Sequence, residues 1–577
     1  MSINPKKTRP PIKVESNGIA YESGATGVSI VHDDGTADEI CGPIRFSANR
    51  KTHGGDSTKV DVIIKDYDGV LKTLTVPRSD CVNPIRLLDK LVDCGLDVHD
   101  NKLTIQFLGV LFRERPPTKT VLELPHPGWC AIPPSRIMVY ATERKVFGSK
   151  EDVKNAVLAA GVSSGFTQSG SVAEWNKNVG RYCIGNPHMQ LAVCIALASP
   201  LLKLSGIQNY GVLLFGDAKT GKTSALGVAG SVIGDFDYVL NWNSTANALE
   251  VIAISRTDGT LILDEIGQGN PKEVADAVYR LMNGQAKNRL GQDTKLNAGK
   301  RFVGLVLASG EHDLRAHLAQ AHIDVKQGQL VRLISVPVYA ENGVFHKLHG
   351  HGSGQELGKT LAENIKLYHG SLAPAFIEHL VENQDEIKAS ISESVKEMTA
   401  KLLDSLQRVP DPGIYGTVAQ SFALAAVAGE MAIENDLLTW LPGDAEAAVI
   451  RCFKAWARHH QKQEANSDAE ILRHVKGILK GGIFVPLSEF DADEPAKPGY
   501  QSKVDKIPAF LIDQDFFESD MCGRFGSTNV IRAIKRCEML MPGARNTPTR
   551  QIHIPKDKQQ GKEKVGFYVV KKEILRA

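Results

Sequence analysis

A short run of residues between Gly216 and Ser224 has the composition of a phosphate-binding loop. It reads GDAKTGKTS, and Gly216, Gly221, Lys222 and Thr223 match the pattern GxxxxGK[ST] completely. Glycines let backbone N–H groups turn toward phosphate oxygens, the lysine reaches the β- and γ-phosphates, and the threonine hydroxyl takes a position on Mg²⁺. The residues predicted to hold ATP are Gly216, Asp217, Ala218, Lys219, Thr220, Gly221, Lys222, Thr223 and Ser224.

Two acidic residues further along the chain supply chemistry that nucleotide binding alone does not need. Asp264 and Glu265 follow the apolar run 261–263. In nucleotide hydrolysis, one carboxylate in this place helps to hold Mg²⁺ and its neighbour polarises the attacking water. An acidic pair after a strand is common by itself, but together with the loop it favours an ATPase. Thr223 and Asp264 are therefore the predicted Mg²⁺ residues, and Glu265 is the predicted base.

Two more polar residues lie at the ends of later apolar runs. Ser309 follows the run FVGLVLA, where an AAA+ ATPase places the sensor that orients the water or touches the γ-phosphate; an ordinary strand-end serine is the alternative. Arg332 begins the run RLISVPV and is the candidate arginine finger, inserted into the nucleotide site of a neighbouring subunit. Because such a head-to-tail contact must close or propagate, it implies a ring or a filament.

The pattern around these residues predicts the elements that position them. Apolar runs alternate with helical stretches from about 190 to 340, as in a parallel α/β domain. Before it, the segments 59–69, 71–77, 102–109 and 136–148 alternate like strands, 84–95 is typical of a helix, and 151–162 continues into a helical stretch. At the end of the chain we expect helices over 469–482, 510–523 and 528–540 and then two strands over 549–555 and 564–575.

The 577 residues exceed the size of one hydrophobic core, so several domains are expected. The predicted fold is an α/β AAA+ P-loop ATPase core with a strand-rich α+β N-terminal domain, a helical lid layer and a C-terminal winged helix. The expected boundaries are a flexible basic arm over 1–20, the strand-rich domain over 21–150, a helical linker over 151–189, the ATPase over 190–345, the helical lid over 346–465 and the winged-helix domain over 466–577.

Basic residues gather in two places that suit a nucleic-acid backbone. Residues 521–577 hold 13 Lys and Arg against 4 Asp and Glu, on a body that is mildly acidic. A solvated surface is the alternative at both places, and for the first group contacts to the next subunit are another. The candidate DNA contacts before the third strand are Lys287, Arg289, Lys295, Lys300 and Arg301, and those near the C-terminus are Arg532, Lys535 and Arg536.

Several other features narrow the class of protein. We find no apolar run of the 18 or more residues that a membrane span needs and no signal-peptide core in MSINPKKTRPPIKVES, so we expect a cytoplasmic protein without a membrane partner. The nine cysteines form no CxxC pair, which disfavours a zinc site. His346, His349 and His351 have ligand-like spacing, but their run holds no carboxylate or thiol.

Several motifs recur together in one known family. They include WNKNVGRYCIGNPHMQLAVCIALASPLLKLSG before the loop, WNSTANALEVIA, TLILDEIGQ, YRLMNGQAKNRL, LASGEHDL, GQLVRL and LYHGSLAPAF. Over about residues 120 to 465 the chain resembles a bacterial family of P-loop proteins from prophages and genomic islands. That family, long described as a domain of unknown function, includes the cassette chromosome helicases of staphylococcal mobile elements.

The resemblance implies an AAA+ ATPase similar to the MCM helicases, hexameric, moving on single-stranded or forked DNA with other replication proteins to replicate a mobile element or prophage. Two departures are visible. An MCM-type N-terminal domain often holds zinc, and the lack of CxxC pairs argues against a zinc site here. The helical segment YGTVAQSFALAAVAGE after the core contains no arginine for a sensor 2 role, which leaves Arg408 upstream as the nearest candidate and the role open.

The sequence therefore predicts an ATP-dependent DNA helicase or translocase that uses ATP and Mg²⁺. Two alternatives keep the same nucleotide site. One is an ATP-dependent DNA-binding initiator or switch that does not unwind DNA. The other is an oligomeric ATPase that acts on a protein partner.

Overall fold

The computed structural model describes residues 11–52, 58–133, 137–159, 165–284, 289–290, 296–297, 302–321, 323, 325, 327–339, 343–490, 497–555 and 562–576. The chain forms two compact units, Met1–Trp456 and Ala457–Ala577.

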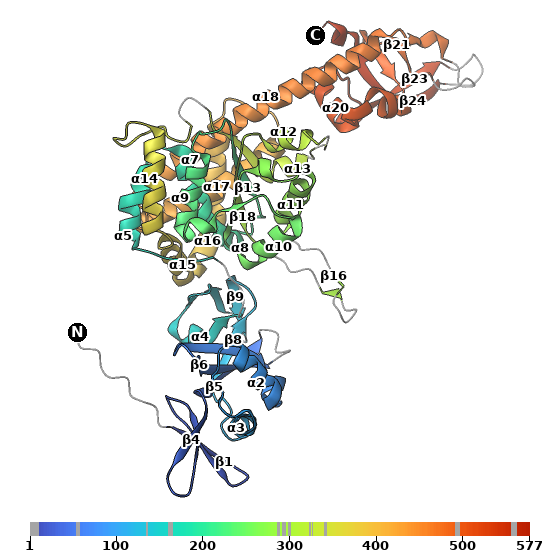
Figure 1. Cartoon of the computed structure of the whole chain (residues 1–577). Coiled ribbons are helices and arrows are strands. Elements are labelled where there is room, and N and C mark those ends of the chain that lie inside the picture. The colour runs from blue at the N-terminus through green and yellow to red at the C-terminus, as the bar shows by residue number, and fades with distance from the viewer. Residues whose placement is uncertain are drawn as a thin grey trace. The chain divides into compact units, whose positions relative to one another are not determined.

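The first part of the first unit is rich in strands, as expected (Figure 1). An antiparallel sheet runs in chain order through β1 (Ile12–Ser16), β2 (Ile19–Ser23), β3 (Val28–Val31) and β4 (Ala37–Cys41). A five-stranded sheet has the order β12-β8-β5-β6-β7 and consists of β5 (Ile44–Thr52), β6 (Thr58–Lys65), β7 (Leu71–Pro77), β8 (Thr120–Leu124) and β12 (Ala156–Leu158). A smaller sheet joins β9 (Gly128–Ile132), β10 (Ile137–Ala141) and β11 (Val146–Phe147), and the helices are α1 (Arg78–Cys81), α2 (Pro84–Asp93), α3 (Asn101–Glu114) and α4 (Lys150–Val153).

Two expectations for this region are wrong. The segment 102–109 is not a strand but part of α3, because Asp100 caps the helix by accepting the N–H of Leu103 at 2.9 Å and because buried Thr104, Phe107 and Leu111 follow helical spacing. The segment 151–162 is not a continuous helix. It forms the short α4 and then β12, which pairs in parallel with the edge of β8.

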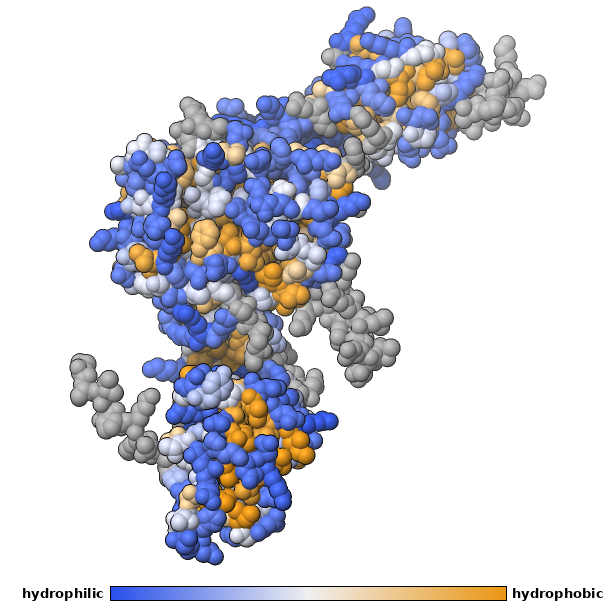
Figure 2. All heavy atoms as spheres, in the orientation of Figure 1, coloured by the Kyte–Doolittle hydropathy of each residue, from blue (hydrophilic) through white to orange (hydrophobic). Residues whose placement is uncertain are grey.

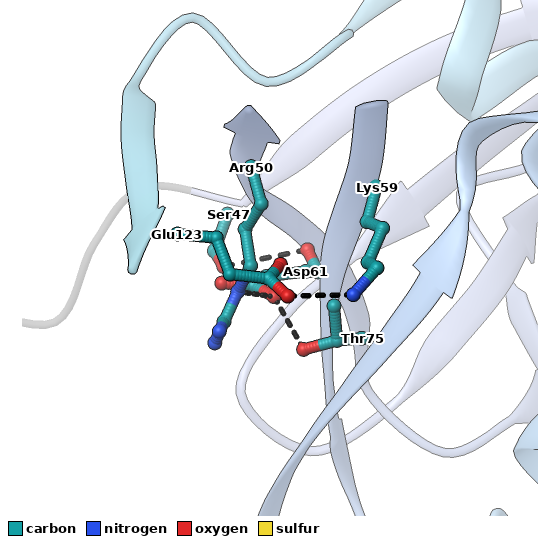
Figure 3. A network of polar contacts seen from close by, with 6 residues as sticks. All are labelled: Ser47, Arg50, Lys59, Asp61, Thr75 and Glu123. Carbon is teal, nitrogen blue, oxygen red and sulfur yellow. Dashed lines mark hydrogen bonds and ion pairs between the residues drawn. The ribbon is translucent and has the colours of Figure 1, made fainter. Parts of the chain in front are cut away.

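Polar side chains connect the strands of the five-stranded sheet (Figure 3). The carboxylate of Asp61 on β6 accepts from Arg50 Nε on β5 and from Thr75 Oγ1 on β7, each at 2.7 Å. Lys59 Nζ pairs with Glu123 on β8 at 2.6 Å. Because Asp61 and Glu123 are buried, these ion pairs satisfy charges that would otherwise be costly in the sheet.

Apolar side chains also lie on the surface of this region. Figure 2 shows them gathered on one face of the N-terminal part. The large apolar residues exposed between positions 67 and 92 are Tyr67, Val70, Leu71, Val82, Ile85 and Val92.

The middle of the first unit is built on a parallel five-stranded sheet, as the alternation of apolar runs predicts. Its order is β14-β15-β18-β13-β19. The strands are β13 (Gly211–Phe215), β14 (Leu240–Asn241), β15 (Thr260–Asp264), β18 (Leu305–Gly310) and β19 (Leu333–Pro337). Between α11 (Pro271–Asn283) and β18, β16 (Arg289–Leu290) and β17 (Leu296–Asn297) pair as an antiparallel hairpin.

Helices cover both faces of this sheet (Figure 1). On one face, α10 (Ala246–Ser255), α11 (Pro271–Asn283) and α12 (Leu314–Ala319) share a hydrophobic core with inward side chains of β13, β15 and β18. The other face carries α7 (Pro187–Ala198) and α9 (Lys222–Ile233), which contact each other. The remaining short helices are α5 (Val172–Trp175), α6 (Arg181–Cys183), α8 (Leu202–Ser205) and α13 (Gln327–Leu330).

The region after the sheet is helical, as expected. It consists of α14 (Gly354–Leu367), α15 (Leu372–Glu382), α16 (Gln384–Asp404), α17 (Pro412–Glu434) and the first part of α18 (Asp444–Lys480). α14 packs on α9, and α17 packs on α7. Against the sequence expectation, Pro187–Ser205 and Pro412–Glu434 are long and apolar enough to span a membrane, but 83% and 67% of these windows are buried inside the fold. Such burial is what core helices show.

The second unit combines the end of α18 with a five-stranded sheet. Its order is β20-β21-β22-β24-β23, formed by β20 (Val485–Pro486), β21 (Gly499–Val504), β22 (Ile507–Ile512), β23 (Thr549–Pro555) and β24 (Lys562–Lys571), with α19 (Gln514–Phe516) and α20 (Ser527–Arg536) between β22 and β23. The expectation of two strands is too low, and 510–523 begins in β22 rather than as a helix. The segment 469–482 is the end of α18, because no glycine or proline interrupts the helix between 444 and 476.

Candidate active site at the carboxyl edge of the parallel sheet

The loop between β13 and α9 requires its two outer glycines. Gly216 has φ +152°, and a Cβ there would lie 2.2 Å from the carbonyl oxygen of Val338. Gly221 has φ +84°, and its Cβ would lie 2.4 Å from the ring of Phe345. Residues with side chains avoid this backbone region and fit neither space. The loop therefore wraps closely under the segment that follows β19.

The side chain of Lys222 lies over this loop. Its ammonium donates to the carbonyl oxygens of Gly216 at 2.9 Å and Asp217 at 2.7 Å. Burial lowers the pKa of Lys222, while the carboxylates of Glu265 and Glu311 act in the opposite direction. A desolvated cation at the N-terminus of α9 is placed to bind an anion.

The acidic pair and the serine are hydrogen-bonded to one another. The hydroxyl of Ser309 donates to Asp264 Oδ1 and accepts the N–H of Glu265 at 3.0 Å. The same N–H lies 3.1 Å from Asp264 Oδ1. Because β18 lies between β13 and β15, it brings Ser309 between the loop and the acidic pair. The sequence predicts the residue types but not this bond network.

The backbone of Glu265 is unusual. Its φ is +55°, the left-handed region that residues other than glycine rarely occupy. Its carboxylate accepts the N–H of Gly267 at 3.3 Å. Strained backbone of this kind is concentrated at functional sites, where the surrounding structure holds it.

Lys222, Glu265 and Ser309 border a cleft of about 1050 Å³, whereas Gly216, Asp217 and Asp264 are not among its lining residues. The predicted residues that line it are Ala218, Lys219, Thr220, Gly221, Lys222, Thr223, Ser224, Glu265 and Ser309. The cleft is also lined by Glu311, Phe345 and Lys359, which the sequence analysis does not single out, and by His346, which it considers only as a metal ligand. Glu311 stands two positions after Ser309 in the motif LASGE, so it could have been found; the others come from the segment before α14 and from α14 itself.

Thr223 and Asp264 offer a hydroxyl and a carboxylate. The Thr223 residue is exposed, and Asp264 Oδ2 takes part in no hydrogen bond among the described residues. Oxygen ligands of this kind fit Mg²⁺, which keeps several waters and the substrate phosphates as its other ligands.

Arg332 lies away from this cleft. It precedes β19, and its carbonyl oxygen accepts the N–H of Gly211 at 2.6 Å at the beginning of β13. Its guanidinium donates to Asn283. Arg332 is therefore at the amino edge of the sheet, whereas the loop and the acidic pair are at the carboxyl edge.

The candidate DNA contacts fall into three groups, namely those outside the described residues, Arg289, and those on α20. Lys287, Lys295, Lys300 and Arg301 lie outside the described residues, and of Arg289 only the backbone in β16 is described. On α20, Arg536 pairs with Glu464 and with Asp468, whereas no ion pair between described residues involves Arg532 or Lys535.

The three histidines pack rather than converge. His349 and His351 each lie with their rings 5.6 Å from that of Tyr182, and His351 also contacts Thr360 at 3.1 Å. Among the described residues, no group of three or more His, Cys, Asp or Glu side chains could hold a metal ion by itself.

Comparison with known proteins gives two matches of different kinds. Residues 14–301 match the model of a family described as a domain of unknown function (DUF927). A solved structure titled "SCCmec type IV Cch - active helicase" has a similar fold, with a TM-score of 0.65 and 16% sequence identity over 96% of this chain and 99% of that chain. No curated protein matches the sequence. The expected resemblance is thus confirmed for the domain of unknown function and for the fold, which is mixed α/β with a parallel sheet.

Proposed function

We propose that the chain is an ATP-driven DNA helicase or translocase of the AAA+ class. The observation that carries the proposal is the bonding of Ser309 to both Asp264 and Glu265, at the cleft that Lys222, Glu265 and Ser309 line. A binding site alone needs the loop and the lysine. Fixed carboxylates beside them are what hydrolysis adds.

Each residue of the cleft has a role in the proposed hydrolysis. Lys222 binds the β- and γ-phosphates after leaving its two carbonyl partners. Thr223 and Asp264 would hold Mg²⁺, which when bound would neutralise charge on the phosphates. Glu265 orients and polarises the attacking water, and Ser309 keeps the Asp264 carboxylate and the Glu265 backbone in place.

Arg332 acts in a neighbouring subunit in this proposal. The sheet separates Arg332 from the cleft of its own chain by the length of β13, about 16 Å for five residues. A guanidinium there supports hydrolysis only if it reaches the cleft of another copy. We therefore propose a ring of copies, a hexamer by resemblance to the MCM helicases.

The oligomer can be tested by mixing two inactive variants. Lys222→Ala removes the phosphate cation and Arg332→Ala removes the finger, so neither alone should hydrolyse ATP. In mixed rings some sites combine an intact Lys222 with an intact neighbouring Arg332, and we expect part of the ATPase activity to return. If activity in the mixture never exceeds that of the separate variants, the finger assignment is wrong.

The proposed substrate is single-stranded or forked DNA. The similarity in fold to a structure titled as an active helicase supports it, as does the basic balance of residues 521–577. The helices α14–α18 would form the lid, the second unit the winged helix, and the β16–β17 hairpin a DNA contact inside the ring. Replication of a mobile element or prophage, with other replication proteins, is the setting that we propose.

Unwinding of a forked duplex by the full chain tests the function. We expect ATP-dependent strand separation by the wild type and none by Lys222→Ala, which should also lose ATP binding. Glu265→Gln should bind ATP and fail to hydrolyse it. Hydrolysis at the normal rate by Glu265→Gln would show that another group polarises the water.

A second candidate is an ATP-gated initiator that binds duplex DNA. Helix α20 favours it, because Arg532 and Lys535, which are partly exposed, form no ion pair within the described part of the chain. DNA-stimulated ATPase activity without unwinding would support this candidate. An ATPase rate that ignores DNA would instead favour action on a protein.

A further inference from the structure

One tryptophan connects the strand-rich part of the first unit to the parallel sheet. Trp129, on β9, donates its backbone N–H to Asp258 Oδ2 at 2.8 Å. Its carbonyl oxygen accepts from Lys203 Nζ at 2.8 Å, and its indole N–H donates to the carbonyl oxygen of Pro200 at 2.8 Å. The ring is fully buried. Both the backbone and the side chain of Trp129 are therefore held.

The backbone just before Trp129 lies very close to the turn before β15. Gly128 has φ +85°, and a Cβ on it would lie 2.3 Å from Asp258 Oδ2 and 2.6 Å from the carbonyl oxygen of Thr257. From β10, Tyr140 donates its hydroxyl to the carbonyl oxygen of Asp258 at 3.0 Å. The turn before β15 is thus contacted at its side chain and at its backbone by β9 and β10.

Burial of the Asp258 carboxyl group costs free energy that packing alone does not explain. It is fully buried, and its Oδ1 has no hydrogen-bond partner among the described residues. A cavity of about 10 Å³ lies beside it. A buried polar atom without a partner costs free energy that an apolar side chain of similar size would not. The hydrogen bond to the backbone N–H of Trp129 is the contact that this carboxylate makes and that an apolar side chain could not make.

The turn is rigidly joined to the proposed catalytic residues. Asp258 donates its N–H to the carbonyl oxygen of Val303 at 2.6 Å, and Thr260 accepts the hydroxyl of Tyr238 at 2.8 Å. From Thr260, β15 runs between β14 and β18 to Asp264. Because β15 is paired with β18 from Thr260 to Leu263 and with β14 at Leu263 and Asp264, a displacement of the turn reaches the acidic pair about 20 Å away.

We propose that Asp258 is a positioning residue, which couples β9 and β10 to the acidic pair through its bond with Trp129. This inference rests on the proposed ATPase activity. The state of the strand-rich part then sets the rate of hydrolysis through the position of β15. Nucleotide binding depends on the loop after β13 and is not coupled in this way.

The test compares kcat with ATP affinity in the full chain. Asp258→Ala removes the bond, and we expect kcat to fall by about tenfold or more, because small misplacements of catalytic groups have effects of this size. The Kd for ATP should stay within about twofold. Asp258→Asn keeps an oxygen that accepts the N–H of Trp129, so it should retain most of the activity. Asp237→Ala, at an exposed aspartate in the segment before β14, is the matched control.

A second variant with a milder effect keeps the inference testable if Asp258→Ala does not fold. Lys203 is exposed, so Lys203→Met should fold; it should lose the bond to the Trp129 carbonyl oxygen and the attraction of its charge for the Asp258 carboxylate. We expect a smaller fall in kcat, about threefold, with unchanged ATP affinity. Unchanged kcat in both Asp258→Ala and Lys203→Met would overturn the inference, as would parallel losses of kcat and ATP affinity. A wild type that hydrolyses no ATP would instead refute the proposed function.

Discussion

Replacing Ser309 by alanine removes a hydroxyl that is bonded to both acidic residues of the cleft. The hydroxyl donates to Asp264 Oδ1 and accepts the N–H of Glu265 at 3.0 Å. After the substitution that N–H still has Asp264 Oδ1 at 3.1 Å. No buried donor is left without a partner, and water can replace the lost bond at the partly exposed Asp264, so the free energy of unfolding should change by about 1 kcal/mol or less.

The expected effect on catalysis is much larger. A hydrogen bond to a charged group contributes about 1.5–3 kcal/mol. If this energy positions Asp264 and Glu265 in the transition state, its loss lowers kcat by about 10- to 150-fold. The contacts of Lys222 do not involve Ser309, so the Kd for ATP should change by no more than about twofold.

Steady-state ATPase rates, ATP binding and thermal unfolding of the same preparations measure the three quantities. Ser335→Ala is a matched control, because Ser335 is on β19, in register with Leu213, and accepts the N–H of Leu314 at 3.3 Å. We expect its kcat to stay near that of the wild type. A normal kcat for Ser309→Ala, in a protein that Glu265→Gln inactivates, would refute the role of Ser309 as the positioning bond.

Three further perturbations test other parts of the structure. Gly221→Ala should abolish ATP binding and lower the melting temperature, because its Cβ would lie 2.4 Å from the ring of Phe345, whereas Gly443→Ala, at φ +89° in open space, should show only the backbone strain of about 1–2 kcal/mol. Lys359→Met should weaken ATP more than ADP in competition binding, because Lys359 faces the cleft from α14; equal weakening would exclude a contact with the γ-phosphate. Burial raises the pKa of Asp258 to about 7, above its usual value, so the native state binds more protons than the unfolded state between about pH 4 and 7. The wild type should therefore lose stability relative to Asp258→Asn as the pH rises through that range. An equal difference between the urea midpoints of the two proteins at pH 5 and at pH 7.5 would contradict this.

The sequence locates the loop between β13 and α9 because its residues are contiguous, and its binding of nucleotide stays a prediction. Gly216 to Ser224 form the turn between one strand and the next helix, and local pattern alone defines them. Phe345 and Lys359 could not be found in this way. They reach the cleft only because the chain returns across the loop after β19, more than a hundred residues later, and no periodicity encodes that return.

Turn chemistry explains what was missed in the second unit. β21 and β22 form a hairpin whose two turn residues, Asp505 and Lys506, have φ +50° and +68°. Both central residues of this turn type need positive φ, and Asn-Gly or Asp-Gly is the usual signal. Because the second turn residue is lysine, the usual turn signal is absent and the sequence alone does not predict this hairpin. In contrast, 102–109 was misread because LTIQFL alternates like a strand, whereas its burial follows the helical period of α3.

In the proposed mechanism the two edges of the parallel sheet have different tasks. The carboxyl edge holds the residues that contact nucleotide, whereas Arg332 and the Asp258 turn lie at the amino edge. A substitution at the amino edge affects the nucleotide only by displacing the strands or by altering the contact with another subunit. Variants there should therefore alter kcat with little effect on ATP affinity, whereas variants of the loop should alter affinity first. This separation lets a neighbouring subunit and the strand-rich part regulate hydrolysis without releasing the nucleotide, as a motor that hydrolyses ATP in turn around a ring requires.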